Sequence, residues 1–525
     1  MPGQTDSAVP QPKAPSVYDA FHFTDLGQNK PTRVEDPYEY QYGFGNRFQS
    51  EIIPGTLPVA QNNPQVPRFN LYTEGLTSSA FGAPRAINSS TYMYRCRPSV
   101  AHDGFLEKFE HKAHLEGCFL SCNPRVKMMP SQYEWPAFPM PTEEDSVDFI
   151  DGLHAVGGSG DANIREGLAL YVFMINRPMN RRAFLNADGD YLVVAQLGDL
   201  DIQTELGKLY LQPGEIAVIQ RGVKFCINPG KNEARGYIVE IWGSSWELPE
   251  LSIIGGHGNA NPRDFMSPVA YMDDPEEIHQ PWQIVDKING EYFAIQQDHS
   301  PFDVAAWHGN CVPYKYDLTK FAGQGSLTID HTDPSIWTVL TAKSRDPHRS
   351  LADFLWFGPK WDVAMNTFRL PYFHRNSASE FIAKIYGSSG GRSVNFQAGG
   401  GSYEAGHTPH GGFQDVYIKE RRKMVNEPRQ IMTKQMTFML ESSRSLLFTE
   451  WGLSHGTTEG TDPEVWKKFS DQFSTDETVR GLLQRVKAQK ARRKALDDAF
   501  YHDEQLPELL ERPLEASNGT NGEAH

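Results

Sequence analysis

Between residues 37 and 297 the sequence consists of short apolar and β-branched runs that glycine, proline and asparagine interrupt every few residues. The clearest stretch is residues 191–227, YLVVAQLGDLDIQTELGKLYLQPGEIAVIQRGVKFCI, in which apolar and polar residues alternate along DLDIQTEL. Glycines fall at the turn positions between its β-branched runs: Gly198, Gly207, Gly214 and Gly222. Strands this short and this closely spaced predict a mainly β protein built from sandwich or jelly-roll domains.

Changes in composition divide the 525-residue chain into four parts. Residues 1–36 are polar and rich in proline, serine and glutamine, which predicts a disordered tail. Residues 37–297 form the predicted N-terminal β-sandwich domain, and residues 298–455 form a second β domain. Residues 456–525 predict a helical appendage, because DPEVWKKFSDQF opens with a helix start signal and the following residues have helical spacing.

The appendage carries a basic run, KAQKARRK, at residues 487–494. Such a run is typical of a nuclear import signal, but it also occurs on the solvated face of an ordinary helix. We favour the solvated face, because charge runs on helices are common.

Charge and composition bear on possible partners and location. The net charge of −16 argues against nucleic acid as the main partner, since phosphate binding needs a basic surface. No run approaches the roughly 18 apolar residues that a membrane span requires, and the first residues lack the apolar core of a signal peptide. Five cysteines, spread thinly along the chain, argue against a disulfide framework. We therefore expect a cytoplasmic protein without a membrane partner.

The stretch DGDYLVVAQLGDLDI and the later LQPGEIAVIQRGVKF resemble the cupin pattern, in which a strand pair leads to a Pro-Gly-acidic turn and then to a metal-binding histidine. Phe225 and Cys226 stand where that histidine would be expected. The resemblance implies that residues 37–297 form a cupin-type sandwich without a metal. Any metal chemistry is then expected in residues 298–455.

Three potential metal ligands stand out in the second β domain. His374 lies in LPYFHRNSASEFIAKIYG, Glu380 follows six positions later, and His410 lies thirty residues beyond that in GGGSYEAGHTPHGG. Two histidines and one carboxylate on one face of a metal ion form the facial triad of non-haem Fe(II) oxygenases. A hydrogen-bonded core histidine, together with an ion pair between the carboxylate and Arg375, would have the same spacing, so the spacing alone leaves both interpretations open.

Longer strings resemble the homogentisate 1,2-dioxygenase family, in order, from about residue 40 to 453. The resemblance implies a cupin-type fold, an Fe(II) cofactor, cleavage of a hydroquinone ring by O₂ and a homo-oligomer, either a trimer or a hexamer of two trimers. The strings are YGFGNRFQSE, PGTLPVAQNNPQVPRFNLYTEGLTSSAF, NPRDF, FDVAAWHGNCVPYKYDL, DPSIWTVLTAKS, FRLPYFHRNSASEF and TPHG.

The same resemblance implies roles for particular residues. His374, Glu380 and His410 match the iron ligands of the family. His308, in WHGN, matches its active-site histidine, which would hydrogen-bond a ring oxygen of the substrate and carry its proton. The alternative is a structural histidine that caps a turn beside Gly309.

The predicted substrate pocket departs from the family pattern. Tyr386 and Ser389 stand where the family carries a basic residue and then a tyrosine, and Glu404 stands where it carries a histidine. His407 is an additional histidine before His410, and it is an alternative metal ligand or proton carrier, although an ordinary polar loop residue is the simpler interpretation. These four residues and Arg375 make up the predicted substrate-binding set.

These changes predict a divergent paralogue with an altered pocket, because Glu404 would repel a carboxylate. The default function is Fe(II)-dependent cleavage of homogentisate to maleylacetoacetate. One alternative is the same chemistry on a different phenolic or hydroquinone substrate, for instance in secondary metabolism. Another is a non-catalytic cupin that binds an aromatic ligand.

A second metal site is conceivable at residues 111–122, HKAHLEGCFLSC, where four residues have spacings near those of zinc ligands. A short amphipathic helix would have the same pattern, and the favoured interpretation is the helix. The four residues are His111, His114, Cys118 and Cys122.

Overall fold

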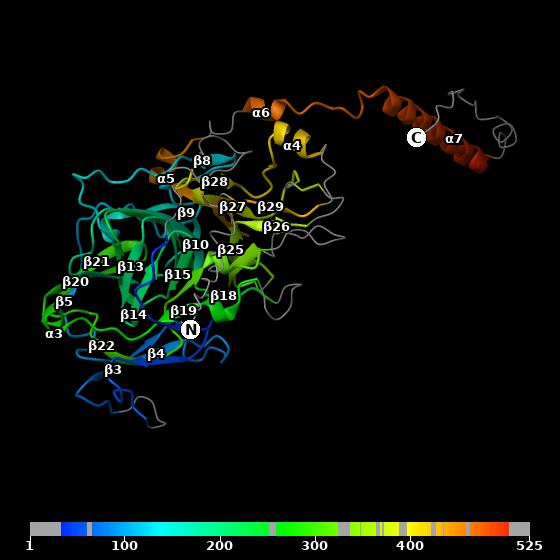
Figure 1. The fold of residues 1–525 in the computed structure, drawn as a ribbon. Coiled ribbons are helices and arrows are strands. Elements are labelled where there is room, and N and C mark those ends of the chain that lie inside the picture. The colour runs from blue at the N-terminus through cyan, green and yellow to red at the C-terminus, as the bar shows by residue number, and fades with distance from the viewer. Residues whose placement is uncertain are drawn as a thin grey trace, which may run out of the picture. The chain divides into compact units, whose positions relative to one another are not determined.

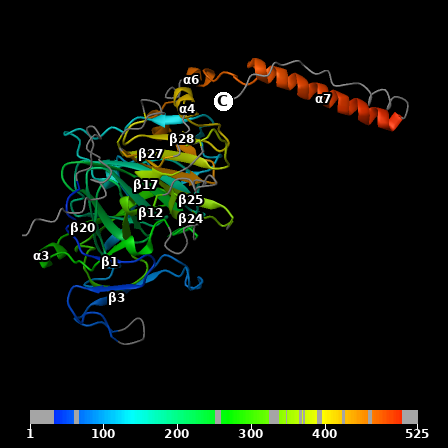
Figure 2. The same ribbon diagram turned by 45° about the vertical axis from the view of Figure 1, so that its right-hand side comes forward.

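The computed structural model describes residues 33–59, 66–250, 259–323, 337–346, 348–363, 368–369, 372–387, 396–421, 427–433, 435–457 and 463–502. The chain divides into two compact units, Met1–Asp462 and Pro463–His525. All β-sheets formed by these residues lie in the first unit, which Figures 1 and 2 show in two views.

An eleven-stranded sheet, here called the central sheet, lies in the middle of the first unit. In spatial order its strands are β1 (Tyr40–Tyr42), β19 (Met266–Pro268), β23 (Tyr314–Asp317), β15 (Glu215–Ile219), β12 (Asp190–Leu197), β17 (Ala234–Trp242), β10 (Glu166–Ile175), β9 (Leu153–Asp161), β31 (Leu447–Thr449) and β7 (Val126–Met128), with β6 (Cys118–Phe119) paired to β9.

A seven-stranded sheet, the N-terminal outer sheet, packs on one face of the central sheet. Its strands are β14 (Gly207–Leu211), β13 (Leu200–Thr204), β16 (Lys224–Pro229), β11 (Arg182–Asn186), β20 (Trp282–Ile288), β21 (Glu291–Gln297) and β5 (Asp103–Lys108).

A second seven-stranded sheet, the C-terminal sheet, packs on the other face of the central sheet. Its strands are β18 (Trp246–Glu247), β24 (Thr338–Lys343), β25 (Ser350–Phe357), β30 (Gln435–Ser442), β27 (Ser379–Gly387), β28 (Gly401–Glu404) and β8 (Tyr133–Trp135).

Strand β10 explains this three-layer arrangement, because side chains alternate between the two faces of a strand. Leu168, Leu170 and Val172 join the core shared with the C-terminal sheet. Tyr171 and Phe173 join the core shared with the N-terminal outer sheet. A strand that is buried on both faces has a nearly continuous apolar sequence, as EGLALYVFMI has.

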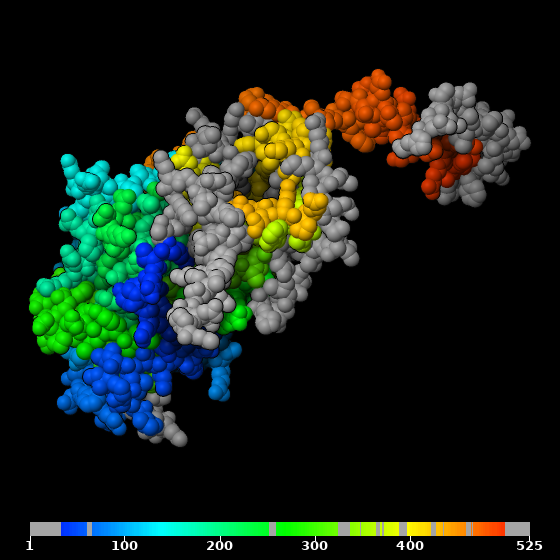
Figure 3. Space-filling model, in the orientation of Figure 1, coloured from blue at the N-terminus to red at the C-terminus, as the bar shows by residue number. Residues whose placement is uncertain are grey.

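Two smaller sheets complete the first unit. A four-stranded sheet contains β2 (Phe48–Glu51), β22 (Val304–Gly309), β4 (Ser90–Arg95) and β3 (Tyr72–Thr77), and a two-stranded sheet contains β26 (Lys360–Asp362) and β29 (Arg429–Ile431). The space-filling view shows the blue N-terminal residues at one end of this unit and the yellow residues near position 400 toward the other end (Figure 3).

Among the described residues the helices are short except α7 of the second unit. They are α2 (Phe149–Gly152), α3 (Pro275–Ile278), α4 (Gln414–Arg421), α5 (Glu450–Ser454), α6 (Pro463–Lys467) and α7 (Glu477–His502), with 3-10 turns at Pro262–Asp264 and Leu318–Lys320. None of the helices within the described residues is long and apolar enough to cross a membrane. The run 487–494 lies in α7, where the side chains are mostly exposed.

The predictions of a mainly β fold and of a helical C-terminal part are confirmed. In β13 the residues alternate between buried and half-buried, as DLDIQTEL predicts. Gly198 and Gly214 lie at turns with φ of 70° and 92°, a left-handed conformation that glycine adopts without steric cost. The predicted division at residue 297 stays a prediction, and strands from both sides of it share sheets: β23 pairs with β15, and β8 pairs with β28.

Candidate metal centre

Strand β27 places Glu380 on the face of the C-terminal sheet that is turned away from the central sheet. Phe381, Ala383 and Ile385 lie in the core between these two sheets. Because neighbouring side chains of a strand point to opposite faces, Glu380 lies on the other face, where its side chain is 5% exposed. The apolar pattern of FIAKIYG therefore positions a carboxylate next to a well-packed core.

The two histidines are fixed to one another through their backbones. His374 and His410 form an antiparallel bridge in which each N–H donates to the carbonyl of the other at 3.1 Å. This double hydrogen bond joins two chain segments that are 36 positions apart, and the ring centroids come to 4.1 Å. The bridge brings both imidazoles to the carboxylate at the start of β27.

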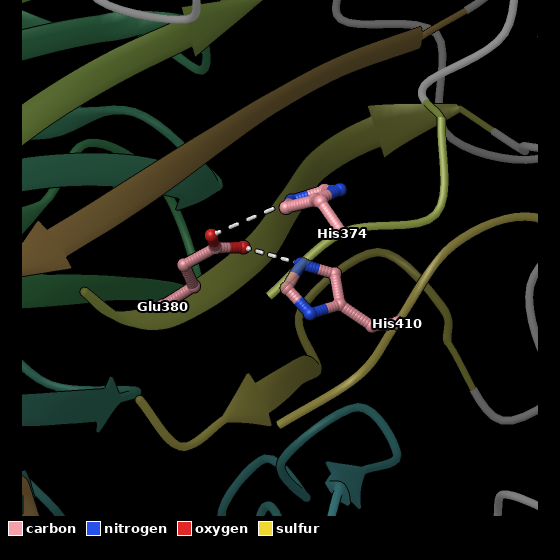
Figure 4. Close-up of side chains that lie close together, drawn as sticks. All are labelled: His374, Glu380 and His410. Carbon is pink, nitrogen blue, oxygen red and sulfur yellow. Dashed lines mark ion pairs between the residues drawn. The ribbon is translucent and has the colours of Figure 1, made fainter. Parts of the chain in front are cut away.

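The side chains of His374, Glu380 and His410 converge, as Figure 4 shows. One potential ligand atom from each residue lies within 4.8 Å of the others. His374 Nε2 is 4.0 Å from Glu380 Oε1, and His410 Nε2 is 3.3 Å from Glu380 Oε2. Within the described residues this is the one group of three or more such side chains that could hold a metal ion.

Hydrogen bonds select the imidazole nitrogens that are available to a metal. His374 Nδ1 donates to the Tyr372 carbonyl, and His410 Nδ1 donates to the Thr408 carbonyl, each at 2.8 Å. This fixes the tautomer with the proton on Nδ1 and leaves both Nε2 atoms as ligands. Two neutral imidazoles and one carboxylate, with no thiolate, are a donor set that suits a divalent metal of the iron type.

The three side chains also perturb one another electrostatically. Burial favours the neutral form of Glu380, but the hydrogen bond and the charge of His410 outweigh burial and hold the pKa of Glu380 below its usual value. Burial likewise disfavours the charged form of His410, but Glu380, the Thr408 carbonyl and Glu404 outweigh it and raise the pKa of His410. Both shifts favour the ionised carboxylate of Glu380 and the cationic form of His410 over their neutral forms.

Asn376 orients the carboxylate, and sequence reasoning missed it. Its Nδ2 donates to Glu380 Oε1 at 2.5 Å, and its carbonyl accepts the N–H of His407 at 2.7 Å. The residue ties the segment after His374 to the turn before His410. The sequence position of Asn376 does not indicate this contact, because the contact depends on a bend between two strands.

Comparison with known proteins identifies the family. Residues 39–318 match the model of the homogentisate 1,2-dioxygenase N-terminal domain, and residues 319–473 match that of the C-terminal domain. The chain belongs to the homogentisate 1,2-dioxygenase family. Homogentisate 1,2-dioxygenase of Homo sapiens is 46% identical over 418 residues, which cover 79% of this chain and 92% of the human protein. The enzyme of Emericella nidulans is 43% identical over 443 residues, which cover 84% and 97% of the two chains.

Solved structures give a weaker likeness than the homogentisate 1,2-dioxygenase sequences. A variant of oxalate decarboxylase from Bacillus subtilis is 12% identical, covers 62% of this chain and 80% of its own, and has a TM-score of 0.26. A cupin superfamily protein from Desulfitobacterium hafniense is 12% identical, covers 20% and 97% of the two chains, and has a TM-score of 0.15. At these TM-scores the likeness supports no inference about function.

Glu404, which is predicted to stand where the family carries a histidine, lies beside the candidate metal centre. It ends β28, and its Cα is paired with that of Glu380 across the β27–β28 ladder. Paired residues of adjacent strands point to the same face of a sheet. Glu404 is 1% exposed, so this face carries two buried carboxylates side by side.

The other predicted pocket residues lie in different surroundings. Tyr386 is 1% exposed and packs in the core between the central and C-terminal sheets, after a register shift in β27. Arg375 is exposed, and so is His407, which has a left-handed φ of 64° and uses its N–H to bind Asn376. Ser389 lies outside the described residues. Their substrate contacts stay predictions.

His308 lies on β22 of the four-stranded sheet, not on the C-terminal sheet. In Figures 1 and 2 the four-stranded sheet lies at the bottom of the first unit, whereas β27 and β28 of the C-terminal sheet lie near its top. The Nε2 atom of His308 is 3.1 Å from the hydroxyl of Tyr94, and burial and the nearby Arg47 lower the pKa of the imidazole. Within one subunit the structure does not bring His308 to the metal centre, and its catalytic role stays a prediction.

The zinc candidate is not assembled by the described residues. His114 Nδ1 lies 3.0 Å from His154 Nδ1, and Cys118 begins β6. None of the two histidines and two cysteines of residues 111–122 belongs to a group of three or more potential metal ligands. The stretch also contains no helix, so the amphipathic helix that the sequence favoured there is wrong.

Proposed function

We propose that the protein is an Fe(II)-dependent homogentisate 1,2-dioxygenase, which opens the ring of homogentisate with O₂ to give maleylacetoacetate. The supporting observation is the convergence of His374, Glu380 and His410 within 4.8 Å in a chain of this family. These side chains are the proposed iron ligands. Ferrous iron would supply a Lewis acid that binds the substrate phenolate and a redox centre that activates O₂.

The reaction sets the requirements for the protein. The bond between the ring carbon that bears the hydroxyl and the ring carbon that bears the side chain breaks, and both atoms of O₂ enter the product. Three protein ligands on one side of an ion leave positions for substrate and O₂. The fixed Nδ1 protons and the Asn376 contact keep the three ligand atoms in place, which lowers the cost of ordering them when the metal binds.

The test is O₂ uptake by the purified protein after anaerobic loading with Fe(II). Addition of homogentisate should consume one O₂ per substrate and produce maleylacetoacetate. His374→Ala should neither retain iron nor consume O₂. Iron bound through His374 without O₂ uptake would refute homogentisate as the substrate and leave the metal centre standing.

A second candidate function is the same chemistry on a different hydroquinone or phenolic acid. The observation that favours it is Glu404, whose buried carboxylate lies beside Glu380. A normal, low KM for homogentisate would refute it. A third candidate, a non-catalytic cupin that binds an aromatic molecule, would require an iron content near zero after anaerobic reconstitution.

We further propose a cytoplasmic homo-oligomer, a trimer or a hexamer of two trimers, whose ligands are the aromatic substrate and O₂. The family resemblance supports the assembly. Apolar side chains of the N-terminal region that are exposed in the single chain, such as Phe81 and Phe105, also support it. Sedimentation velocity would measure the assembly directly.

A further inference from the structure

A pocket of about 370 Å³, here called the arginine pocket, lies where four segments of the first unit meet. Its walls come from the end of β3 and the loop that follows, the turn between β9 and β10, the end of β11, and the turn between β15 and β16. None of its lining residues among those described belongs to the C-terminal sheet, which carries Glu380. A pocket of this volume has room for a small organic molecule.

Charge sets the arginine pocket apart from the rest of this acidic chain. The whole chain has a net charge of −16, yet the described lining of the pocket contains two arginines, Arg165 and Arg221, and no carboxylate. The sequence neighbour of Arg165 is acidic, but the carboxylate of Glu166 forms ion pairs with Arg345 and Arg444. A pocket lined by one sign of charge concentrates small ions of the opposite sign, because its walls focus the field.

Hydrogen bonds hold Arg221 in place. Its backbone N–H donates to Asp190 Oδ1 at 2.9 Å, and its Nη2 donates to the Ser78 carbonyl at 2.5 Å. Asp190 is 5% exposed and does not line the pocket, so its carboxylate offsets only part of the positive charge of the two arginines. Nε and Nη1 of Arg221 donate to no acceptor among the described residues. A guanidinium group in this state can bind a carboxylate or a phosphate through two parallel hydrogen bonds.

Other donors of the arginine pocket are also unused within the described part of the chain. The exposed guanidinium of Arg165 makes no hydrogen bond or ion pair there, while its backbone N–H donates to the Ala162 carbonyl at 3.1 Å and fixes the turn. The hydroxyl of Thr77 and the backbone N–H groups of Ser79 and Ala80 likewise meet no acceptor among these residues. Successive N–H groups where the chain bends can bind one anion together.

We propose that the arginine pocket is a binding site for a small organic dianion, either a dicarboxylate or a phosphate ester. Arg165 and Arg221 bind its oxyanion groups, and the loop after β3 supplies the hydroxyl and N–H donors. Two guanidinium groups favour a dianion over a monoanion, and the acidic surface around the pocket disfavours a long polyanion such as nucleic acid. The site itself does not depend on the proposed ring cleavage. If that function holds, its product, a dicarboxylate, belongs to the ligand class.

The test is isothermal titration of the full chain, at low ionic strength, with three probes: maleate, inorganic phosphate and acetate. We expect at least one of the two dianions to bind with a dissociation constant below about 1 mM, and acetate to bind at least tenfold more weakly. The affinity for the dianion should be unchanged in His374→Ala, because the pocket contains no residue of the metal centre. Binding of phosphate but not maleate would identify the ligand as a phosphate ester, and the reverse would identify it as a dicarboxylate.

Replacement of the two arginines locates the bound anion. Arg165→Gln should raise the dissociation constant of the dianion at least tenfold, and Arg221→Gln should do the same. The matched control is Arg85→Gln, which removes an exposed charge from the loop after β3 without altering the pocket lining, and it should change the affinity less than twofold. If Arg221→Gln does not fold, Arg165→Gln decides alone, because its exposed side chain supports no other residue described. Arg165→Lys should recover part of the affinity, since it restores the charge without the fork.

Three results would overturn the proposal. The first is that none of the probes binds to the full chain. The second is that Arg165→Gln binds the dianion as tightly as the wild type, or that Arg85→Gln weakens binding as much as Arg165→Gln does. The third is that His374→Ala abolishes binding, which would assign the anion to the metal centre. A failure of O₂ uptake with homogentisate would refute the proposed function and leave these binding results standing.

Discussion

Asn376 Nδ2 donates a hydrogen bond of 2.5 Å to Glu380 Oε1, and the carbonyl of the same asparagine accepts the N–H of His407. One side chain thus holds the carboxylate of the metal centre, while its backbone holds the turn that leads to His410. The contact links the two segments that carry the histidines. It makes the geometry of the centre a property of the folded chain before any metal binds.

Replacement of this asparagine should weaken metal binding without unfolding the protein. For Asn376→Ala we expect the Fe(II) dissociation constant to rise by about 10- to 100-fold, the usual effect of removing a partner of a metal ligand. Arg375→Ala is the control, because its side chain is exposed, and it should change the affinity less than twofold. Equal affinities of Asn376→Ala and wild type would show that the hydrogen bond does not orient Glu380.

The assignment of the ligands predicts different outcomes for two neighbouring histidines. His410→Ala should abolish stoichiometric iron binding and activity, because it removes one of three ligands. His407→Ala should keep both, since the side chain of His407 is exposed. Metal analysis after gel filtration measures the difference. Iron retained by His410→Ala and lost by His407→Ala would reverse the assignment.

The coupling of Glu380 and His410 predicts how pH affects the metal-free protein. The raised pKa of His410 contributes stability that is fully present below the unfolded value of about 6.5 and is lost as pH rises through the folded value. The lowered pKa of Glu380 contributes stability that is present above about 4.3 and is lost as pH falls through the folded value. The pair should therefore stabilise the folded, metal-free protein most between about pH 4.3 and 6.5.

Thermal midpoints of metal-free wild type and His410→Gln, measured from pH 5 to 9, test this window. The thermal midpoint of the wild type should exceed that of His410→Gln by less as pH rises above 7. Iron binding should show the opposite trend and strengthen as pH rises, because the metal competes with the proton on His410. A difference in midpoint that stays constant over this range would refute the coupling.

The position of His308 predicts that its loss has little effect on chemistry within its own subunit. His308→Gln should keep kcat within about threefold, because β22 lies in a different sheet from the ligands and glutamine can still bind the Tyr94 hydroxyl. Steady-state O₂ uptake measures this. A loss of 100-fold or more with full iron content would show that His308 reaches a metal centre, as the resemblance of WHGN implies.

Much of the fold follows from local sequence. The alternation of DLDIQTEL and the glycines between its neighbouring strands specify short antiparallel strands, because side-chain direction in a strand has a period of two and tight turns need left-handed backbone. The three proposed iron ligands were also predicted from sequence, through strings long enough to resemble a family, and the structure brings their side chains together. Helix α7 was predicted from its spacing alone.

The arrangement of the sheets required the tertiary structure. Strand β8 joins the C-terminal sheet from far upstream, and β31 returns from the end of the first unit to the central sheet. Hydrogen bonds between such distant strands leave no periodic trace in either one. The register shift in β27, after which the ring of Tyr386 lies in the core, likewise could not be read from the sequence, and the substrate contact of Tyr386 stays a prediction.

The sequence by itself determined the strand pattern, the helical C-terminal part, the family and the three residues that converge at the candidate metal centre. Only the tertiary structure decided which side chains surround those ligands. It brought Asn376 to Glu380, paired Glu404 with Glu380 and separated His308 from all three. The physical reason is that periodicity fixes the face on which a side chain lies, while its neighbours depend on the register between strands that are distant in sequence.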